Sequence, residues 1–498
     1  RLSTEEDYSA AIYSKEDLII NGNGTLNVNA GYRNGIKSTD DCIIVSGTLN
    51  ITSTEDGIIG KDLCGIVAGD ININAGSDGV KSTYDTDTTK GNVIIEGGNI
   101  TIKASNDGIQ AENILVINDG TINIKTNNGA ADTTQTHIDN MDMGRGGFGF
   151  NNNKTTTTTD DTSESRKGIK AGNMLIINDG DITIDSDDDS VHCNSVIYIY
   201  GGTINAATGD DGVHADDLLT VNGGTINITQ CYEGIEADDI VINDGDISVV
   251  SSDDGINSSD GSITINGGNL LINASGDGLD ANGSIIINGG YIVVLGPTSD
   301  GDTAIDYDDS CTINGGTVMA FGSSGMLEIP KGASNGACIV TAFTSVSGGS
   351  KYTLSDSNGN EILSYTPSKA YAAAIVYSDK ITTGNTYDIT AGSTTLSIEV
   401  TSDVTSNVSS GLGKAGGMNM PGNGGSGMPN NGSSDNGMNG NSNGSMPDMS
   451  GNGAPDMNGN SSGDMPSMGG NSSNNGGNMP NMNNGSSNGS APQMNNRM

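Results

Sequence analysis

The sequence predicts an all-β protein: a parallel β-helix of about twelve coils of ~22 residues, then a small β cap and a disordered tail. A small residue between a polar and an aliphatic residue recurs, most often every 22 residues, from Gly35 and Gly57 onward to Gly301. Within each period apolar and polar residues alternate, as in Thr225-Ile226-Asn227-Ile228. Only 33 % of the 498 residues are apolar and none is Trp, which suits one thin, long core rather than several compact ones.

Each coil is expected to contain three short strands separated by corners. One strand carries two inward aliphatic side chains, a second precedes a Gly-rich turn, as in Ile114–Ile117, and a third follows an Asp-Gly corner, as in Gly212–Ala215. The inward pair recurs as Leu26/Val28, Leu49/Ile51, Ile71/Ile73, Ile100/Ile102, Ile122/Ile124, Ile182/Ile184, Ile226/Ile228, Ile247/Val249 and Leu270/Ile272. Stacking coils ~4.8 Å apart would give a rod of roughly 60 Å.

Three segments are expected, with the β-helix over residues 1–330. A long, low-complexity insertion at 129–167 is predicted to leave the coil at one corner. Outward positions turn apolar in the last coils, as at Leu271, Val293 and Phe321, and residues 331–403 are predicted to fold back as a β cap over them. Residues 404–498 are rich in Gly, Asn, Ser and Met and are predicted to be disordered.

The charge restricts the class of partner. Sixty-one acidic residues face 20 Lys and Arg, for a net charge of −41, which argues against nucleic acid and anionic membrane surfaces. The sequence contains no run of ~18 apolar residues, so membrane insertion is not expected. The chain begins at a polar segment from Arg1, so we expect that a leader has been removed and that the protein is secreted, either free outside the cell or at its surface. We also expect a monomer.

The acidic residues are concentrated in one part of the repeat. Residues 171–330 contain 24 Asp, 3 Glu and no Lys or Arg. Positions one period apart stack in a β-helix, so the position three residues after the corner acid forms a column that runs from basic to acidic. This column is Lys37, Ile59, Lys81, Gln110, Lys170, His192, His214, Glu236, Asn257 and Asp280.

Stacked carboxylates predict bound calcium. At ~5 Å two of them repel by roughly 0.8 kcal/mol in water and by about 3–4 kcal/mol at a partly screened surface. Calcium accepts six to eight oxygen ligands in flexible geometry, which corner carboxylates, carbonyls and Asn side chains supply. The predicted ligands are Asp188, Asp189, Asp210, Asp211, Asp216, Asp217, Glu233, Glu236, Asp238, Asp239, Asp253, Asp254, Asp260, Asp277 and Asp280. The alternative is a solvated acidic face in which Asp-Gly acts only as turn chemistry.

The predicted carbohydrate-contacting residues are Tyr198, Tyr200, Tyr232, His192 and His214. Tyrosine rings are the available stacking surfaces for sugars, and Tyr198 and Tyr200 both point outward in the expected strand. His192 and His214 stack on adjacent coils, which fits a transition-metal site or a general base, although surface residues without a ligand role are the simpler interpretation. The Asn column before the Gly-rich turns predicts a structural hydrogen-bonded ladder. Cys42 and Cys64 share a column, compatible with either a disulfide or stacked thiols.

The coils of the type Ile-Asn-Gly-Gly-Thr-Ile-Asn-Ile followed by Asp-Asp-Gly-Val-His-Ala-Asp-Asp, together with the segment Tyr352–Glu361, carry a resemblance. They resemble the secreted, carbohydrate-binding right-handed β-helix proteins of anaerobic Gram-positive bacteria, over residues 5–403. The resemblance implies a right-handed, pectate-lyase-like fold, Ca²⁺ as cofactor with ligands at the Asp-Asp-Gly and Ala-Asp-Asp positions, and plant cell-wall polysaccharides such as pectin or cellulose as partners.

The function expected from the sequence is therefore secreted, calcium-dependent polysaccharide binding without catalysis. A polysaccharide lyase on the same fold is the first alternative. The catalytic base of a lyase is typically Arg or Lys, and residues 171–330 contain neither. The base would have to be Arg166, Lys167 or Lys170 at the edge of this stretch, or one of the two histidines. A hydrolase with paired carboxylates is a related alternative. A structural or adhesive surface rod is the second, and it suits the absence of Trp.

Overall fold

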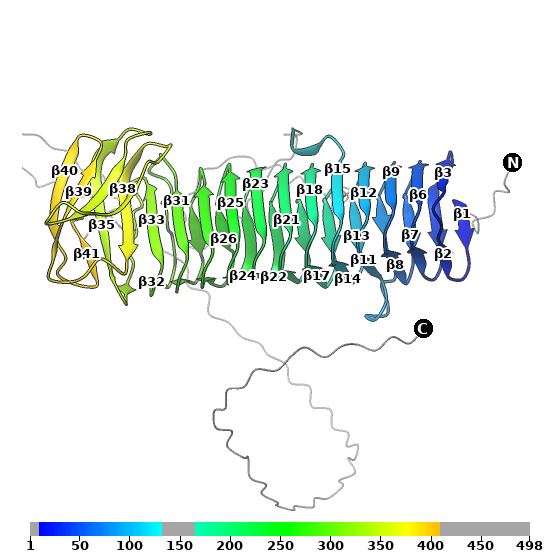
Figure 1. Cartoon of the computed structure of the whole chain (residues 1–498), viewed down its shortest axis with the longest axis horizontal. Coiled ribbons are helices and arrows are strands. Elements are labelled where there is room, and N and C mark those ends of the chain that lie inside the picture. Colours follow the sequence, from blue (N-terminus) through cyan, green and yellow to red (C-terminus); the bar gives the residue numbers. More distant parts are fainter. Residues whose placement is uncertain (1–8, 132–164, 409–498) are drawn as a thin grey trace, which may run out of the picture. The chain divides into compact units, whose positions relative to one another are not determined.

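The structure is a computed structural model that describes residues 9–131 and 165–408, and its strands stack as the coils of a parallel β-solenoid (Figure 1). The predicted fold class is confirmed. Within the described ranges the only helix is the 3₁₀ turn η1 (Gly129–Ala131). No helix in these ranges is both long and apolar enough to cross a membrane.

One face of the solenoid consists of twelve parallel strands, which belong to a fifteen-stranded sheet. These strands are β3 (Thr25–Ala30), β6 (Thr48–Ser53), β9 (Asp70–Ala75), β12 (Asn99–Ala104), β15 (Thr121–Thr126), β18 (Asp181–Ser186), β21 (Thr203–Thr208), β23 (Thr225–Cys231), β25 (Asp246–Ser251), β28 (Asn269–Asn273), β31 (Tyr291–Leu295) and β33 (Thr317–Gly322). The pairing of Ile226 with Ile204 and Ile247 on the neighbouring coils shows the in-register stacking that the repeat predicts.

Two further strand positions complete each coil. The first, which follows the acidic corner, is occupied by β1 (Ala10–Ser14), β4 (Asn34–Ser38), β7 (Ile58–Gly60), β10 (Val80–Lys81), β13 (Ile109–Ala111), β16 (Ile169–Ala171), β19 (Val191–Cys193), β26 (Ile256–Ser258) and β29 (Leu279–Ala281). The second is occupied by β2 (Leu18–Ile20), β5 (Cys42–Ile44), β8 (Leu63–Ile66), β11 (Asn92–Ile95), β14 (Ile114–Ile117), β17 (Met174–Ile177), β20 (Val196–Ile199), β27 (Ile263–Ile265), β30 (Ser284–Ile287), β32 (Ser310–Ile313) and β34 (Gly332–Ala333). The longer strands β22 (Val213–Val221) and β24 (Ile235–Ile242) run through both positions.

The core is a narrow stack of aliphatic layers. The inward residues Ile226 and Ile228 are 1 % and 0 % exposed, as the alternating pattern predicts. The coils approach each other closely at the acidic corner, where most coils have a glycine, although Ser190 and Ala304 occupy the same position on two coils. A Cβ added at Gly212 would lie 2.5 Å from the carbonyl oxygen of Gly234 and 2.4 Å from Ile228 Cδ1.

After β34 the chain leaves the solenoid repeat and forms seven further strands. These are β35 (Ala337–Val346), β36 (Tyr352–Asp356), β37 (Glu361–Tyr365), β38 (Tyr371–Ser378), β39 (Thr386–Ala391), β40 (Thr394–Glu399) and β41 (Val404–Ser406). Strand β38 pairs antiparallel with β33, and β36, β37, β39 and β40 form a sheet of their own. These strands bury Val293 and Phe321 in a second hydrophobic cluster, whereas Leu271 stays 41 % exposed.

The predictions of a mobile insertion and a disordered tail fall mainly on residues 132–164 and 409–498, which lie outside the described residues. Cys42 and Cys64 stack on paired strands, and all six cysteines are free thiols buried in the core.

Candidate cation and carbohydrate sites

The acidic corner is first of all a structural ladder. At several coils one carboxylate oxygen of the corner residue accepts a backbone N–H from the next coil. Asp189 Oδ1 accepts from Asp211 N at 3.1 Å, and Asp211 Oδ1 accepts from Glu233 N at 3.2 Å. Asp254 Oδ1 accepts from Asp277 N at 2.6 Å. Each carboxylate is therefore held at its corner by the fold, and its second oxygen is free to meet the side chain three residues on.

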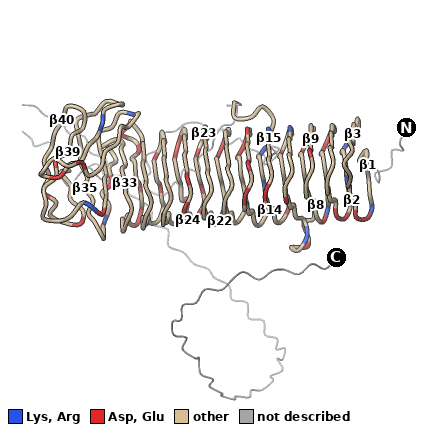
Figure 2. The backbone as a smooth tube through the Cα atoms, in the orientation of Figure 1, with Lys and Arg blue, Asp and Glu red and all other residues tan. Residues whose placement is uncertain are grey.

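That side chain belongs to the column that the sequence predicts, and strand pairing confirms the column from Lys37 to Asp280. Among its early members Lys81 neutralises the corner acid, since Lys81 Nζ lies 2.6 Å from Asp78 Oδ2. Its later members are Glu236 and Asp280, which face corner acids of the same sign. Figure 2 shows the acidic residues that line these coils.

Two histidines and three carboxylates converge where the column changes sign. His192 Nδ1 lies 2.8 Å from Asp189 Oδ2. His214 Nδ1 lies 3.1 Å from Asp211 Oδ2 and 3.3 Å from Glu236 Oε2, and the two imidazole rings are 4.9 Å apart. We call these five residues the histidine cluster. His192 is only 8 % exposed, so the interpretation of His192 as a surface residue is wrong: its ring is enclosed by the neighbouring coils.

The electrostatics of the histidine cluster follow from burial and crowding. Burial alone would lower the pKa of His214, but the hydrogen bond with Asp211 and the charges of Asp189 and Glu236 raise it to about 10. Burial raises the pKa of Glu236 to about 7; the charge of His214 lowers this pKa and the charge of Asp211 raises it further. Burial and the neighbouring charge of Glu236 raise the pKa of Glu233 to about 9. The carboxylates here outnumber the cations that face them.

Basic residues reach this region only from its edge. Lys167 Nζ lies 2.8 Å from Asp188 Oδ1 and 2.6 Å from Asp189 Oδ2, and its charge helps hold the pKa of Asp189 well below its usual range against the effect of burial. Arg166 Nη1 pairs with Asp187 at 2.8 Å. Asp210, which groups with Asp188 and Asp189, still has a pKa raised to about 8 by burial and by the charge of Asp211.

A second cluster contains carboxylates alone. One oxygen each from Asp254, Asp277 and Asp280 lies within 4.8 Å of the others, and we call these three residues the carboxylate cluster. Burial is the largest cause that raises the pKa of both Asp254 and Asp277 to about 8, and the charge of Asp280 adds to it. No Lys or Arg occurs between residues 171 and 330, so this cluster is without a basic residue from its own coils.

Several predicted ligands lie elsewhere. These residues lie between the first and second strand positions of their coils: Asp216 and Asp217 within β22, Asp238 and Asp239 within β24, and Asp260 after β26. Hydrogen bonds from neighbouring coils hold three of them, since Ser195 Oγ donates to Asp217, Ser259 Oγ to Asp238 and the Ser262 N–H to Asp239. Of the five, Asp216 approaches the histidine cluster, with Oδ1 at 3.6 Å from His214 Nε2. Asp253 adds charge beside Asp254.

Sequence reasoning missed two places. Asp17, Asp40 and Asp41 bring carboxylate oxygens within 4.8 Å of one another near the first coils, and the Asp40-Asp41 pair was their signal. The step of 29 residues from Gly79 to Gly108 marks the second place, the loop between β10 and β11. Tyr84 of this loop and Glu112 on the following coil help line a cavity of about 280 Å³.

The tyrosines divide between two parts of the coil. Tyr198 on β20 and Tyr200 directly after it lie side by side, with ring centroids 6.3 Å apart and planes at 23°. Tyr200 is 52 % exposed. We call this pair the tyrosine platform. Tyr232 is not part of it, because its backbone N–H bonds to Asp210 at the acidic corner.

Tyr200 interrupts the asparagine ladder, whose hydrogen bonds the structure confirms. Asn178 Nδ2 donates to Asn118 at 2.7 Å on one side of the interruption. On the other side Asn243 Nδ2 donates to Asn222 at 2.9 Å. An exposed aromatic ring thus stands where the neighbouring coils carry ladder amides, which marks this position as different from the repeat.

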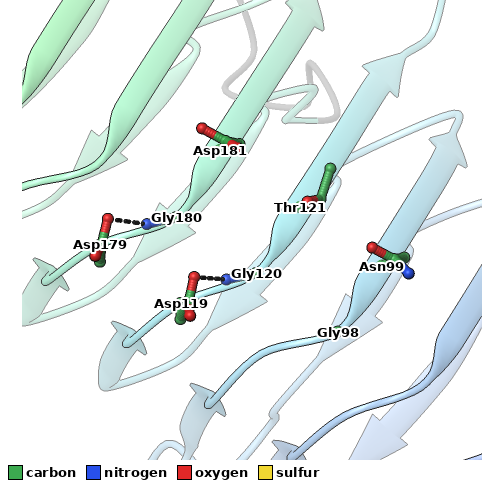
Figure 3. Close-up of a pocket in the computed structure, with 8 residues that line it drawn as sticks. All are labelled: Gly98, Asn99, Asp119, Gly120, Thr121, Asp179, Gly180 and Asp181. Carbon is green, nitrogen blue, oxygen red and sulfur yellow. Dashed lines mark hydrogen bonds between the residues drawn. The ribbon is translucent and has the colours of Figure 1, made fainter.

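A shallow polar groove lies on the coils that precede the platform (Figure 3). It measures about 320 Å³ and is lined by Gly98, Asn99, Asp119, Gly120, Thr121, Asp179, Gly180 and Asp181. Asp119 and Asp179 each accept the N–H of the following glycine through one oxygen. Since Tyr200 N bonds to Ile177 O, Tyr200 sits one coil beyond Asp179, and the groove and the tyrosine platform adjoin.

Comparison with known proteins decides the family. A family model described as "Carbohydrate-binding domain-containing protein" matches residues 1–212 and 210–443, which is most of the chain. The chain belongs to this family. A relative from Acetivibrio thermocellus with the same description is 44 % identical over 43 residues, which are 9 % of this chain and 15 % of that protein. No solved structure matches.

Membership in the carbohydrate-binding family supports the sequence-based resemblance at two levels, the ligand class and the β-solenoid fold. Carbohydrate is the ligand class that the family description names. The choice of polysaccharide, the calcium requirement and the likeness to pectate lyases remain predictions.

Proposed function

We propose that this protein binds plant cell-wall polysaccharide outside the cell, in a calcium-dependent manner and without catalysis. The observation that carries the proposal is the tyrosine platform beside the polar groove, on a chain of a carbohydrate-binding family. Exposed aromatic rings stack against the apolar faces of sugar rings, while amides and carboxylates hydrogen-bond to their hydroxyl groups. The groove next to Tyr200 supplies such groups at Asn99, Asp179 and Asp181.

Calcium is assigned to the carboxylate cluster. Asp254, Asp277 and Asp280 offer oxygen donors alone, which is the ligand set that hard divalent cations prefer. Their burial and like charge raise the pKa values of Asp254 and Asp277, so a cation that binds there removes a repulsion already present in the fold. Calcium bound on this face would also bridge to the carboxylates of a uronate polymer, which the net charge of −41 would otherwise repel.

The test is a calorimetric titration of the purified protein with polygalacturonate and with cellulose oligomers, each in Ca²⁺ and in EDTA. Tyr200→Ala is expected to lose most of the affinity, whereas Tyr291→Ala serves as the matched control, since Tyr291 is 44 % exposed on β31. Ultraviolet absorbance of unsaturated sugar products is followed in the same samples. Growing absorbance would identify a lyase instead, and no binding to either glycan would leave a structural rod.

A further inference from the structure

The histidine cluster differs from the carboxylate cluster in its donor chemistry. It contains two imidazoles beside three carboxylates, whereas Asp254, Asp277 and Asp280 offer oxygen alone. Mixed nitrogen and oxygen donors favour zinc and similar first-row metals, while all-oxygen sets favour calcium and magnesium. The two clusters therefore predict different ions on one molecule.

The donor spacing fits a single small ion. Zinc bonds of about 2.0–2.1 Å in a tetrahedron place neighbouring ligand atoms roughly 3.3 Å apart. The distances from His214 Nδ1 are 3.1 Å to Asp211 Oδ2 and 3.3 Å to Glu236 Oε2. A nitrogen of His192 and one of His214 lie within 4.8 Å of each other and of an Asp189 oxygen, which places His192 beside this donor set.

The surroundings orient one nitrogen of each ring toward the centre. His192 Nε2 lies 2.9 Å from Asn194 Oδ1, an oxygen that accepts only, so this nitrogen carries the hydrogen. Nδ1 faces Asp189 Oδ2 at 2.8 Å, and a bound ion would take the place of the hydrogen shared between these two atoms. Metal-bound histidines characteristically donate their other ring N–H to a partner that fixes their orientation, and Asn194 holds His192 in this way.

The neighbouring charges favour a cation on the His214 side. Lys167 Nζ pairs with Asp188 and Asp189, at 2.8 and 2.6 Å, whereas the cationic partner of Asp211 and Glu236 in the described part of the chain is His214. Burial matters too, because His214 and Glu236 side chains are only 25 % and 20 % exposed. Carboxylates crowded in this manner need either a protonated imidazole or a metal ion between them.

We propose that His214, Asp211 and Glu236, completed by His192, form a zinc-type transition-metal site distinct from the calcium site, with Asp189 and Asn194 as positioning residues. The site does not include the tyrosine platform, because its ligands lie at the acidic corner and on the strand that follows it, so Zn²⁺ binding is measured without polysaccharide. The geometry assigns it a structural role, since its ligands come from three consecutive coils and a bound ion would tie those coils together.

The experiment uses the full chain, stripped with a chelator and then titrated with Zn²⁺ and Co²⁺ in an excess of Ca²⁺. One ion per chain is expected, with the visible absorption bands of four-coordinate Co²⁺ that Zn²⁺ then displaces. His214→Ala is expected to weaken Zn²⁺ binding by roughly 100-fold or more, and Asn194→Ala by about 10- to 100-fold, as for outer partners of metal ligands. Asp277→Asn, in the carboxylate cluster, is the matched control and should leave Zn²⁺ affinity unchanged.

The outcomes separate cleanly. Stoichiometric Co²⁺ with four-coordinate bands in the unmodified protein, lost in His214→Ala and kept in Asp277→Asn, supports the site. If His214→Ala fails to fold, the spectrum of the unmodified protein and the Asn194→Ala variant still decide. No Zn²⁺ retained against Ca²⁺, or equal loss of Zn²⁺ and Ca²⁺ in Asp277→Asn, would overturn the proposal and leave the histidines as protonated partners of the carboxylates.

Discussion

Replacing Tyr200 with asparagine should separate carbohydrate binding from stability. The new amide would stand between Asn178 and Asn222, where the asparagine ladder is interrupted. Two added amide hydrogen bonds contribute ~0.5 kcal/mol each at an exposed site, near the lower end of their range. The lost ring contact with Tyr198 costs ~0.5–1.5 kcal/mol. The free energy of unfolding should therefore change by less than about 1 kcal/mol.

The effect on binding should be larger. A tyrosine buries about 150–250 Å², so one ring face is roughly 60 Å², and covering it with a sugar contributes ~1.5 kcal/mol at about 25 cal/mol per Å². Loss of that face should raise the Kd about tenfold. Calorimetry with the polysaccharide that binds best measures the Kd, and urea unfolding measures the stability.

Two results would refute this reasoning. A Kd within about twofold of the unmodified protein would show that the tyrosine platform is not the binding surface. A loss of more than about 3 kcal/mol in unfolding free energy would show that Tyr200 is a packing residue, as large core truncations behave. Tyr291→Asn is the matched control, expected to leave the Kd unchanged.

Three further predictions concern the carboxylates and the corners. Added Ca²⁺ should raise the Tm, by an amount that grows with its concentration, and Asp277→Asn should abolish most of that rise; a rise of equal size in the variant would place the ion elsewhere. In EDTA, the free energy of unfolding should increase as the pH falls from about 9 toward 5. The pKa values of Glu233 and Asp254 are raised to about 9 and 8 in the folded state, so the folded state binds more protons than the unfolded one over this range. Urea unfolding across that range measures the trend, and a stability that falls with decreasing pH would contradict it. Gly212→Ala should destabilise the protein by about 1–3 kcal/mol or more, because the added Cβ would lie 2.5 Å from the Gly234 carbonyl oxygen. A change below about 0.5 kcal/mol in the free energy of urea unfolding would show that the corner can relax.

The sequence by itself determined the coil and its columns. Side chains in a strand alternate with period two and coils stack in register, so a repeat near 22 residues is enough to place Lys170, His192, His214 and Glu236 one above another. The same reasoning predicts the asparagine ladder, whose hydrogen bonds the structure confirms. The outward tyrosine pair followed too, since Tyr198 and Tyr200 are two residues apart on one face.

Only the tertiary structure decided which carboxylates share a site. Periodicity does not tell which oxygen already accepts a backbone N–H from the next coil, as Asp189 Oδ1 does, because that depends on the path of the chain around the corner. It also does not tell how far apart the corners lie, and so the predicted ligand Asp239 joins none of the groups found among the described residues, whereas Asp211 groups with His214 and Glu236. Lys167 meets Asp189 only because the chain re-enters the coil in register after its long insertion.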